Sequence, residues 1–172
     1  MLHHSTPSVA TCHFSQVLAG MRASDLGLTL TPLELADLPF AQQLARFRHA
    51  AILTGMHGAG YANIIFMAPG SVVAELCPLG YCTQSYERIS ARLDLTYMRW
   101  TNSIAENAKP GYDTIVDVAQ FIVLMRRAVD AWWRFDSSTR GATTRDADED
   151  EQRGEQWSNR DAGGAIVDVR QL

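Results

Sequence analysis

Residues 50–76 read AAILTGMHGAGYANIIFMAPGSVVAEL, and this stretch decides the fold. It begins with an apolar run of strand length at 50–54 and ends with a second one at 71–76. Continuous apolar runs of this length are typical of parallel strands that are buried on both faces. Between them lie glycines at 55, 58 and 60, a helical pattern at 61–67 and a stop at Pro69-Gly70. The stretch therefore predicts a strand, a glycine-rich loop, a helix and a second strand.

The same alternation continues on both sides of this stretch. Upstream, we expect a helix at 13–21, a short strand at 28–31 and a helix that Asp37 caps and that runs to about His49. Downstream, we expect a helix at about 83–92, a strand at 95–100 and a long amphipathic helix that Asp117 caps and that runs to about Arg134. The apolar face of that last helix comprises Val118, Phe121, Ile122, Met125, Val129 and Trp132. This order predicts the α/β class, with a Rossmann-like parallel sheet flanked by helices.

The composition suggests one globular domain and excludes two kinds of partner. We expect residues 1–12 to be disordered and residues 13–136 to form the domain. We expect a disordered acidic and polar tail at 137–172, because 140–161 holds only one large apolar residue, Trp157. The formal net charge of -4 argues against nucleic-acid binding, which needs a basic face. No apolar run approaches the ~20 residues of a membrane helix, and residues 1–7 lack the pattern of a signal peptide, so we expect no direct membrane contact.

The three cysteines, Cys12, Cys77 and Cys82, do not have the spacing of a structural zinc site. Only four residues separate Cys77 from Cys82. This spacing is compatible with a short local disulfide and equally with two free thiols beside a buried strand.

The glycine-rich loop at 55–60 is a candidate anion-binding site. It lies where a strand ends and a helix begins, and helix N-termini present unpaired N–H groups together with a partial positive charge. Glycines allow the backbone to approach a phosphate closely. The spacing G-x-x-G-x-G is neither the dinucleotide fingerprint nor a P-loop. Alone, the loop is equally compatible with a tight strand-to-helix turn.

His57 and Glu75 are the two side chains that strengthen this interpretation. His57 lies inside the loop, where it can donate to a diphosphate, or else simply orient the loop. Glu75 ends a strand of Val and Ala, so we expect its carboxylate to emerge at the same sheet edge and to bind ribose hydroxyls. The alternative is a carboxylate that backbone amides satisfy. A lipase-type oxyanion loop at 57–60 is excluded, because the chain has no Gly-x-Ser-x-Gly elbow and no histidine after His57.

Taken together, residues 50–63 and 66–76 resemble the hallmark of glycosyltransferase family 61, which includes the EGF-domain and protein-O-mannose N-acetylglucosaminyltransferases. In that family a strand ending in Gly-x-His-Gly-Ala-Gly leads to Thr-Asn or similar, then to Phe-x-Pro-Pro-Gly and a strand ending in Glu. Leu38-Pro39-Phe40-Ala41-Gln42-Gln43 and Tyr97-Met98-Arg99-Trp100 are similar to flanking elements. The resemblance covers about 13–134 and is specific at 52–75.

The resemblance implies the C-terminal half of a GT-B glycosyltransferase, with 13–136 as its nucleotide-sugar-binding domain. It implies inverting transfer from a UDP-sugar to a protein or glycan acceptor, without a cofactor or an obligatory metal, in the lumen of the endoplasmic reticulum or Golgi. N-acetylglucosamine is the favoured sugar and xylose the next. By position, the diphosphate would contact His57, Gly58, Ala59 and Gly60, with Asn63 nearby and Glu75 near the nucleoside. Tyr61 departs from the family's usual Leu, which puts the fit of the nucleoside pocket in question.

The resemblance implies a further N-terminal half that supplies most of the acceptor site, and we expect that half to be missing from this sequence. We therefore expect a fragment, a truncated gene product or a degenerate copy, and we nominate no catalytic base. The function that follows is the donor-binding half of a glycosyltransferase. The alternative is a truncated, non-catalytic nucleotide-binding module.

Overall fold

The computed structural model describes residues 9–35, 38–78, 82–102, 115–143 and 164–170, of which 9–14, 136–143 and 164–170 are described by their backbone alone. Five parallel strands form one sheet in the order β1-β5-β2-β3-β4. Their bounds are Leu28–Glu34 for β1, Ile52–Met56 for β2, Val72–Cys77 for β3, Thr96–Thr101 for β4 and Gly164–Arg170 for β5. The predicted α/β class with a parallel sheet is confirmed.

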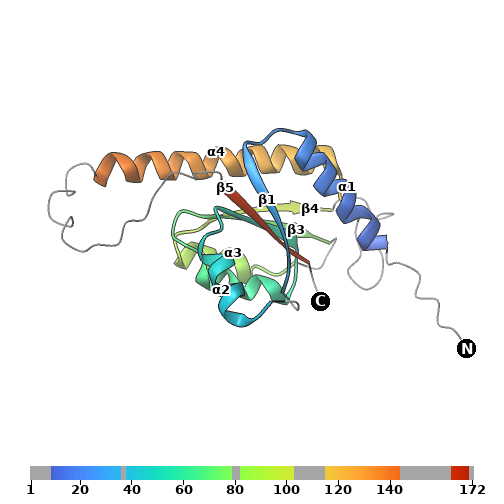
Figure 1. The fold of residues 1–172 in the computed structure, drawn as a ribbon, viewed down its shortest axis with the longest axis horizontal. Coiled ribbons are helices and arrows are strands. Elements are labelled where there is room, and N and C mark those ends of the chain that lie inside the picture. The colour runs from blue at the N-terminus through green and yellow to red at the C-terminus, as the bar shows by residue number, and fades with distance from the viewer. Residues whose placement is uncertain (1–8, 36–37, 79–81, 103–114, 144–163, 171–172) are drawn as a thin grey trace, which may run out of the picture.

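Helices cover the sheet on both faces (Figure 1). Helices α1 (Val9–Ala23) and α4 (Val118–Thr143) lie on one face. On the other face lie α2 (Phe40–Arg48), the short helix η2 (Ala59–Phe66) and α3 (Ser85–Arg92). Within the first layer α1 packs closely on α4, since a Cβ atom at Gly20 would lie 2.5 Å from Val118 Cγ1.

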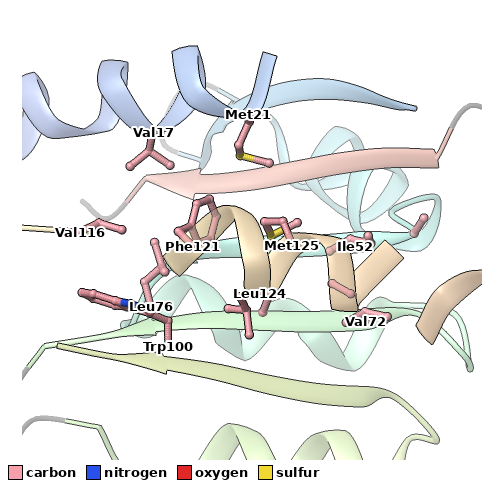
Figure 2. Close-up of a cluster of buried hydrophobic side chains, with 13 residues drawn as sticks. Val17, Met21, Ile52, Val72, Leu76, Trp100, Val116, Phe121, Leu124 and Met125 are labelled. Atoms are coloured by element: carbon pink, nitrogen blue, oxygen red, sulfur yellow. The ribbon is translucent and has the colours of Figure 1, made fainter. Parts of the chain in front are cut away.

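The core is divided by the sheet into two clusters, because successive side chains of a strand point to opposite faces. The cluster under α1 and α4 contains the apolar face predicted for α4, with Phe121 and Met125 fully buried (Figure 2). The second cluster joins Leu53 and Val73 of the sheet to Phe47 of α2 and to Tyr61 and Ile64 of η2. In α2, Phe47 is buried and Phe40 is 63% exposed.

Of the two predicted N-terminal caps, Asp37 for α2 and Asp117 for α4, the described residues test only the second. Asp117 caps α4 as predicted, because its Oδ1 accepts a hydrogen bond from the Gln120 backbone N–H at 3.0 Å. Helix α2 begins after Pro39 without a side-chain cap, and Asp37 lies outside the described residues.

The helix predicted after the glycine loop is present, and it is a 3₁₀ helix at Ala59–Phe66. Its turns close by i→i+3 bonds, from Tyr61 N to Gly58 O at 3.1 Å and from Met67 N to Ile64 O at 3.0 Å. The buried Tyr61 side chain draws this first turn down onto the sheet, since its hydroxyl donates to carbonyls of β2 and β3. The tight turn of η2 therefore accompanies the contact between the Tyr61 hydroxyl and the sheet.

The predicted limits of the ordered domain also need correction. Helix α1 begins at Val9, and α4 continues to Thr143, past the expected boundary at 136. Strand β5, at 164–170, lies inside the sheet and pairs with β1 along its whole length and with β2 from Ile52 to Gly55. The expected tail at 137–172 therefore contains the end of a helix and an internal strand, while 144–163 lie outside the described residues. This strand was not predicted, because its pairing partners β1 and β2 lie far away along the chain.

Candidate functional site

The candidate site lies at the carboxyl ends of β2 and β3, beneath the glycine loop. The two strands run in register, with Gly55 opposite Glu75 and Met56 opposite Leu76. The His57 backbone N–H donates to Leu76 O at 2.7 Å, so the chain leaves the sheet immediately afterwards. Crevices at this end of parallel strands are where open α/β sheets bind ligands.

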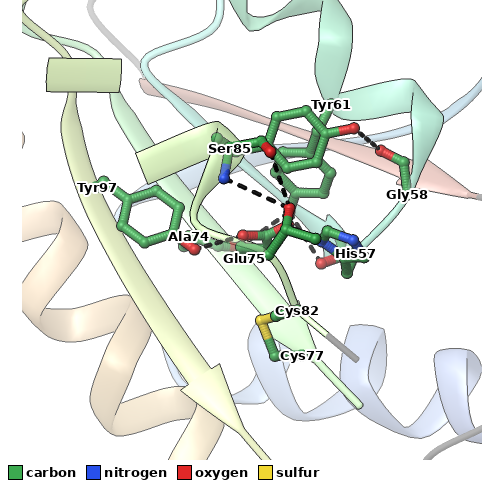
Figure 3. Close-up of polar contacts among 12 residues, drawn as sticks. His57, Gly58, Tyr61, Ala74, Glu75, Cys77, Cys82, Ser85 and Tyr97 are labelled. Carbon is green, nitrogen blue, oxygen red and sulfur yellow. Dashed lines mark hydrogen bonds and ion pairs between the residues drawn. A yellow bond between two sulfur atoms is a disulfide. The ribbon is translucent and has the colours of Figure 1, made fainter. Parts of the chain in front are cut away.

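Glu75 is the centre of the polar contacts at this place. It is fully buried, on the face of β3 that also carries Val73. Its Oε1 lies 2.5 Å from His57 Nδ1, and its Oε2 accepts a hydrogen bond from the Tyr97 hydroxyl of β4 (Figure 3). Both carboxylate oxygens therefore have side-chain partners, which a buried carboxylate requires to be tolerated.

Two further tyrosines hold the glycine loop from below. The Tyr61 hydroxyl lies 2.9 Å from Gly55 O and 3.2 Å from Ala74 O, and the Tyr86 hydroxyl donates to Gly58 O at 2.6 Å. The Tyr86 ring packs against those of His57 and Tyr61, with centroid separations of 5.5 and 5.4 Å. Both ends of the 55–58 segment are thus tied to tyrosine hydroxyls, one from the buried Tyr61 and one from the partly buried Tyr86, so the loop is preorganised.

Burial and the Glu75 charge keep Tyr86 and Tyr97 protonated. Burial raises the pKa of Tyr86, and the negative charge of Glu75 raises it further. Burial also raises the pKa of Tyr97 far above its ordinary value, assisted by the hydrogen bond to Glu75 and by the charge of that carboxylate. A neutral hydroxyl is what each needs in order to donate.

The structure brings together some of the predicted site residues and not others. His57 and Glu75 are in direct contact, and Gly58 is held by Tyr86. The Asn63 side chain donates a hydrogen bond within η2, from Nδ2 to Gly60 O at 3.2 Å. Ala59 and Gly60 form the start of η2.

The expectation for the Glu75 side chain is confirmed in its position and wrong in its exposure. Its carboxylate lies at the same sheet edge as the glycine loop, 2.5 Å from His57 Nδ1, but it is fully buried. It is satisfied by His57 and Tyr97 rather than by backbone amides. The cause is the alternation of β3, which turns Glu75 toward η2 and α3.

The roles of Tyr86 and Tyr97 were not predicted. Tyr97 pairs with Val73, and Arg99, two residues later, pairs with Glu75. Strand pairing alone would therefore have placed the side chains of Tyr97 and Glu75 on the same face of the sheet. Tyr86 reaches Gly58 across 28 residues of sequence, and no local pattern signals such a contact.

A disulfide between Cys77 and Cys82 settles the alternatives left open for these cysteines. The two Cα atoms are 5.5 Å apart, within the usual range for the bond. The disulfide lies beside the His57–Glu75 pair (Figure 3). One donor atom each from His57, Glu75 and Cys82 lies within 4.8 Å of the others.

No helix among the described residues combines the length and the apolar character that crossing a bilayer would require.

Comparisons with known proteins agree with the motif. Residues 8–74 match the protein-family model described as Glycosyltransferase 61. A protein O-linked-mannose beta-1,4-N-acetylglucosaminyltransferase 2 of Tetraodon nigroviridis is 32% identical over 90 residues, which cover 49% of this chain and 16% of that relative. Proteins of the same name from Bos taurus and Homo sapiens are 28% identical over the same shares. The chain thus matches about one sixth of the length of these relatives, and the family resemblance is confirmed.

Proposed function

We propose that this chain, whose residues 8–74 match glycosyltransferase family 61, supplies the nucleotide-sugar site of a glycosyltransferase. The donor is a UDP-sugar, with N-acetylglucosamine as the transferred group, and the acceptor is a hydroxyl of a protein or glycan. The observation that carries the proposal is the preorganised 55–60 loop at the carboxyl ends of β2 and β3, with His57 held in place by the buried Glu75.

The diphosphate of the donor would lie against the loop. Backbone N–H groups at the start of η2 can donate to phosphate oxygens, and the absence of side chains at Gly58 and Gly60 allows close approach. Since Glu75 holds Nδ1 of His57, contact between the imidazole and a phosphate oxygen would be made by Nε2. Because Glu75 is fully buried, its role in this scheme is to position His57 rather than to contact the nucleoside.

The sugar and the stereochemistry follow from the names of the relatives. They are beta-1,4-N-acetylglucosaminyltransferases acting on protein O-linked mannose. Activated N-acetylglucosamine is α-linked to its diphosphate, so a β product requires inversion at the anomeric carbon. The proposal includes a GT-B partner domain, a metal-independent reaction and a lumenal location. The Cys77–Cys82 disulfide is of the kind that persists in oxidising compartments.

A second candidate function is a nucleotide-binding module without transferase activity of its own. The burial of Glu75 favours it, because a carboxylate that is closed off from solvent cannot take the proton of an acceptor hydroxyl. In that case UDP binds and no sugar is transferred.

Calorimetric titration of the full chain with UDP, GDP and NAD tests the binding site. We expect UDP to bind selectively and His57→Ala to weaken it roughly 10–100-fold, the loss of a charge-assisted hydrogen bond. His49→Ala is the matched control, since His49 is exposed and follows α2, before the amino end of β2. Folded protein that ignores UDP, or equal losses in both variants, would overturn the donor site.

Transfer assays separate the two candidates. Incubation with UDP-N-acetylglucosamine and an O-mannosylated peptide should give a β-linked product if the chain is catalytic. Tight UDP binding without product would favour the non-catalytic module.

A further inference from the structure

We propose that reduction of the Cys77–Cys82 disulfide opens a site for Zn²⁺ made of His57, Glu75 and Cys82. The inference does not rest on the proposed function, since it concerns metal binding alone.

The three ligands come from three separate segments that the fold brings together. His57 lies in the loop after β2, Glu75 in β3 and Cys82 in the segment before α3. Their donor atoms lie within 4.8 Å of one another, and His57 and Glu75 already touch at 2.5 Å (Figure 3). Glu75 is fully buried and His57 is 11% exposed, which distinguishes this group from acidic clusters on the surface.

The chemistry of the donors selects the metal. An imidazole nitrogen, a thiolate and a carboxylate are the ligand types of zinc, and three protein ligands leave a fourth position for water. At zinc's usual bond lengths, donor atoms in a tetrahedral site lie about 3.4–3.6 Å apart. The His57–Glu75 pair must therefore open slightly, as the metal replaces their shared proton, and Cys82 must move inward.

Tyr97 supplies the outer contact that such sites require. Its hydroxyl donates to Oε2 of Glu75, which leaves Oε1 facing His57. Hydrogen bonds of this kind orient the ligands of a metal, and their removal costs 10–100-fold in affinity in other proteins.

The disulfide controls the site through Cys82. In the oxidised state the Cys82 sulfur is bonded to Cys77 and carries no negative charge, and the thiolate is the form that binds metals. A dithiol reductant delivers two electrons and two protons: the S–S bond breaks, two thiols form, and the reductant becomes its own disulfide. The Cys82 thiol then loses its proton to solvent as it binds the metal.

A matched pair of variants tests the proposal, with Cys12→Ser included in both. Cys77→Ser and Cys82→Ser each abolish the disulfide, but only the first retains the Cys82 thiol. Full-length variants are titrated with Co²⁺ as a spectroscopic probe and then with Zn²⁺ in competition, after circular dichroism has established folding. We expect Cys77→Ser to show thiolate-to-cobalt absorption and to bind Zn²⁺ at least about tenfold more tightly than Cys82→Ser.

Further variants in the Cys77→Ser background identify the other ligands. We expect His57→Ala and Glu75→Gln to lose at least about tenfold in Zn²⁺ affinity, and Tyr97→Phe to lose about tenfold. Equal affinity in the two cysteine variants, or no thiolate absorption in Cys77→Ser, overturns the site. If neither cysteine variant folds, titration of the native chain before and after phosphine reduction decides. Absorption that appears only on reduction and is lost in His57→Ala supports the proposal, and its failure to appear overturns it.

Discussion

On strand β3, Val72, Ala74 and Leu76 face α1 and α4, whereas Val73 and Glu75 face η2 and α3. The first face is an apolar layer closed by Phe121 and Met125. The second carries a buried carboxylate that two side chains hold. The comparison teaches that one strand can serve stability and chemistry together, because its alternation keeps the two environments on opposite sides of the sheet.

The largest loss of folding stability should come from a substitution in the apolar face of the sheet, under α1 and α4. Phe121→Ala removes a fully buried ring and leaves a cavity, so we expect the free energy of unfolding to fall by about 3–5 kcal/mol. Chemical denaturation measures the loss. Val123→Ala, on the same helix but 59% exposed, should change stability by less than about 0.5 kcal/mol. Similar losses in the two variants would contradict the assignment of this face to the core.

A smaller effect should come from the polar face. Tyr61→Phe keeps the ring but removes the hydroxyl that reaches Gly55 O and Ala74 O, and we expect a loss of about 1–3 kcal/mol. The substitution should also loosen the glycine loop, so UDP affinity should fall in the same variant. Unchanged stability and binding would mean that the hydroxyl does not hold the loop.

The cap of α4 offers a still smaller change within the apolar layer. Asp117→Ala removes the acceptor for the Gln120 N–H, and we expect a loss of about 1 kcal/mol by chemical denaturation. Asp117→Asn keeps an acceptor oxygen and should restore most of the stability. If the asparagine and alanine variants are equally destabilised, capping is not the cause.

The smallest effect is a dependence on alkaline pH that belongs to the polar face alone. The pKa values of Tyr86 and Tyr97 are raised above the ordinary value of 10.0, so both stay protonated in the folded protein where the unfolded chain ionises. Their contribution to stability is fully present below pH 10 and is lost as pH rises from there toward the folded pKa.

We therefore expect unfolding free energies to fall as the pH rises from about 10 to 11. Tyr97→Phe should flatten this slope, whereas Val123→Ala, at an exposed position of α4, should leave it unchanged. A slope that is identical in Tyr97→Phe and the native chain would sink the assignment.

Much of the fold was predictable because local pattern and final structure agree there. The apolar runs at 50–54 and 71–76 became β2 and β3 with small shifts of their bounds, and Asp117 capped α4 as its position suggested. The motif at 55–60 likewise placed His57 at the sheet edge. These features depend on neighbours within one turn or one strand, which sequence patterns report directly.

What escaped prediction depends on partners that are far away along the chain. β5 is a strand because β1 and β2 lie on either side of it, and η2 is a tight helix because Tyr61 is drawn under the loop. The burial of Glu75 depends on Tyr97, 22 residues later, as much as on β3 itself.

The α/β alternation, the glycine loop and the family resemblance could all be inferred from contiguous residues. Three features are set by folding alone: the contact of His57 with the buried Glu75, the bond between Cys77 and Cys82, and the strand near the C-terminus that completes the sheet. The physical reason is that burial and pairing are properties of what surrounds a residue, and distant segments supply those surroundings only after folding.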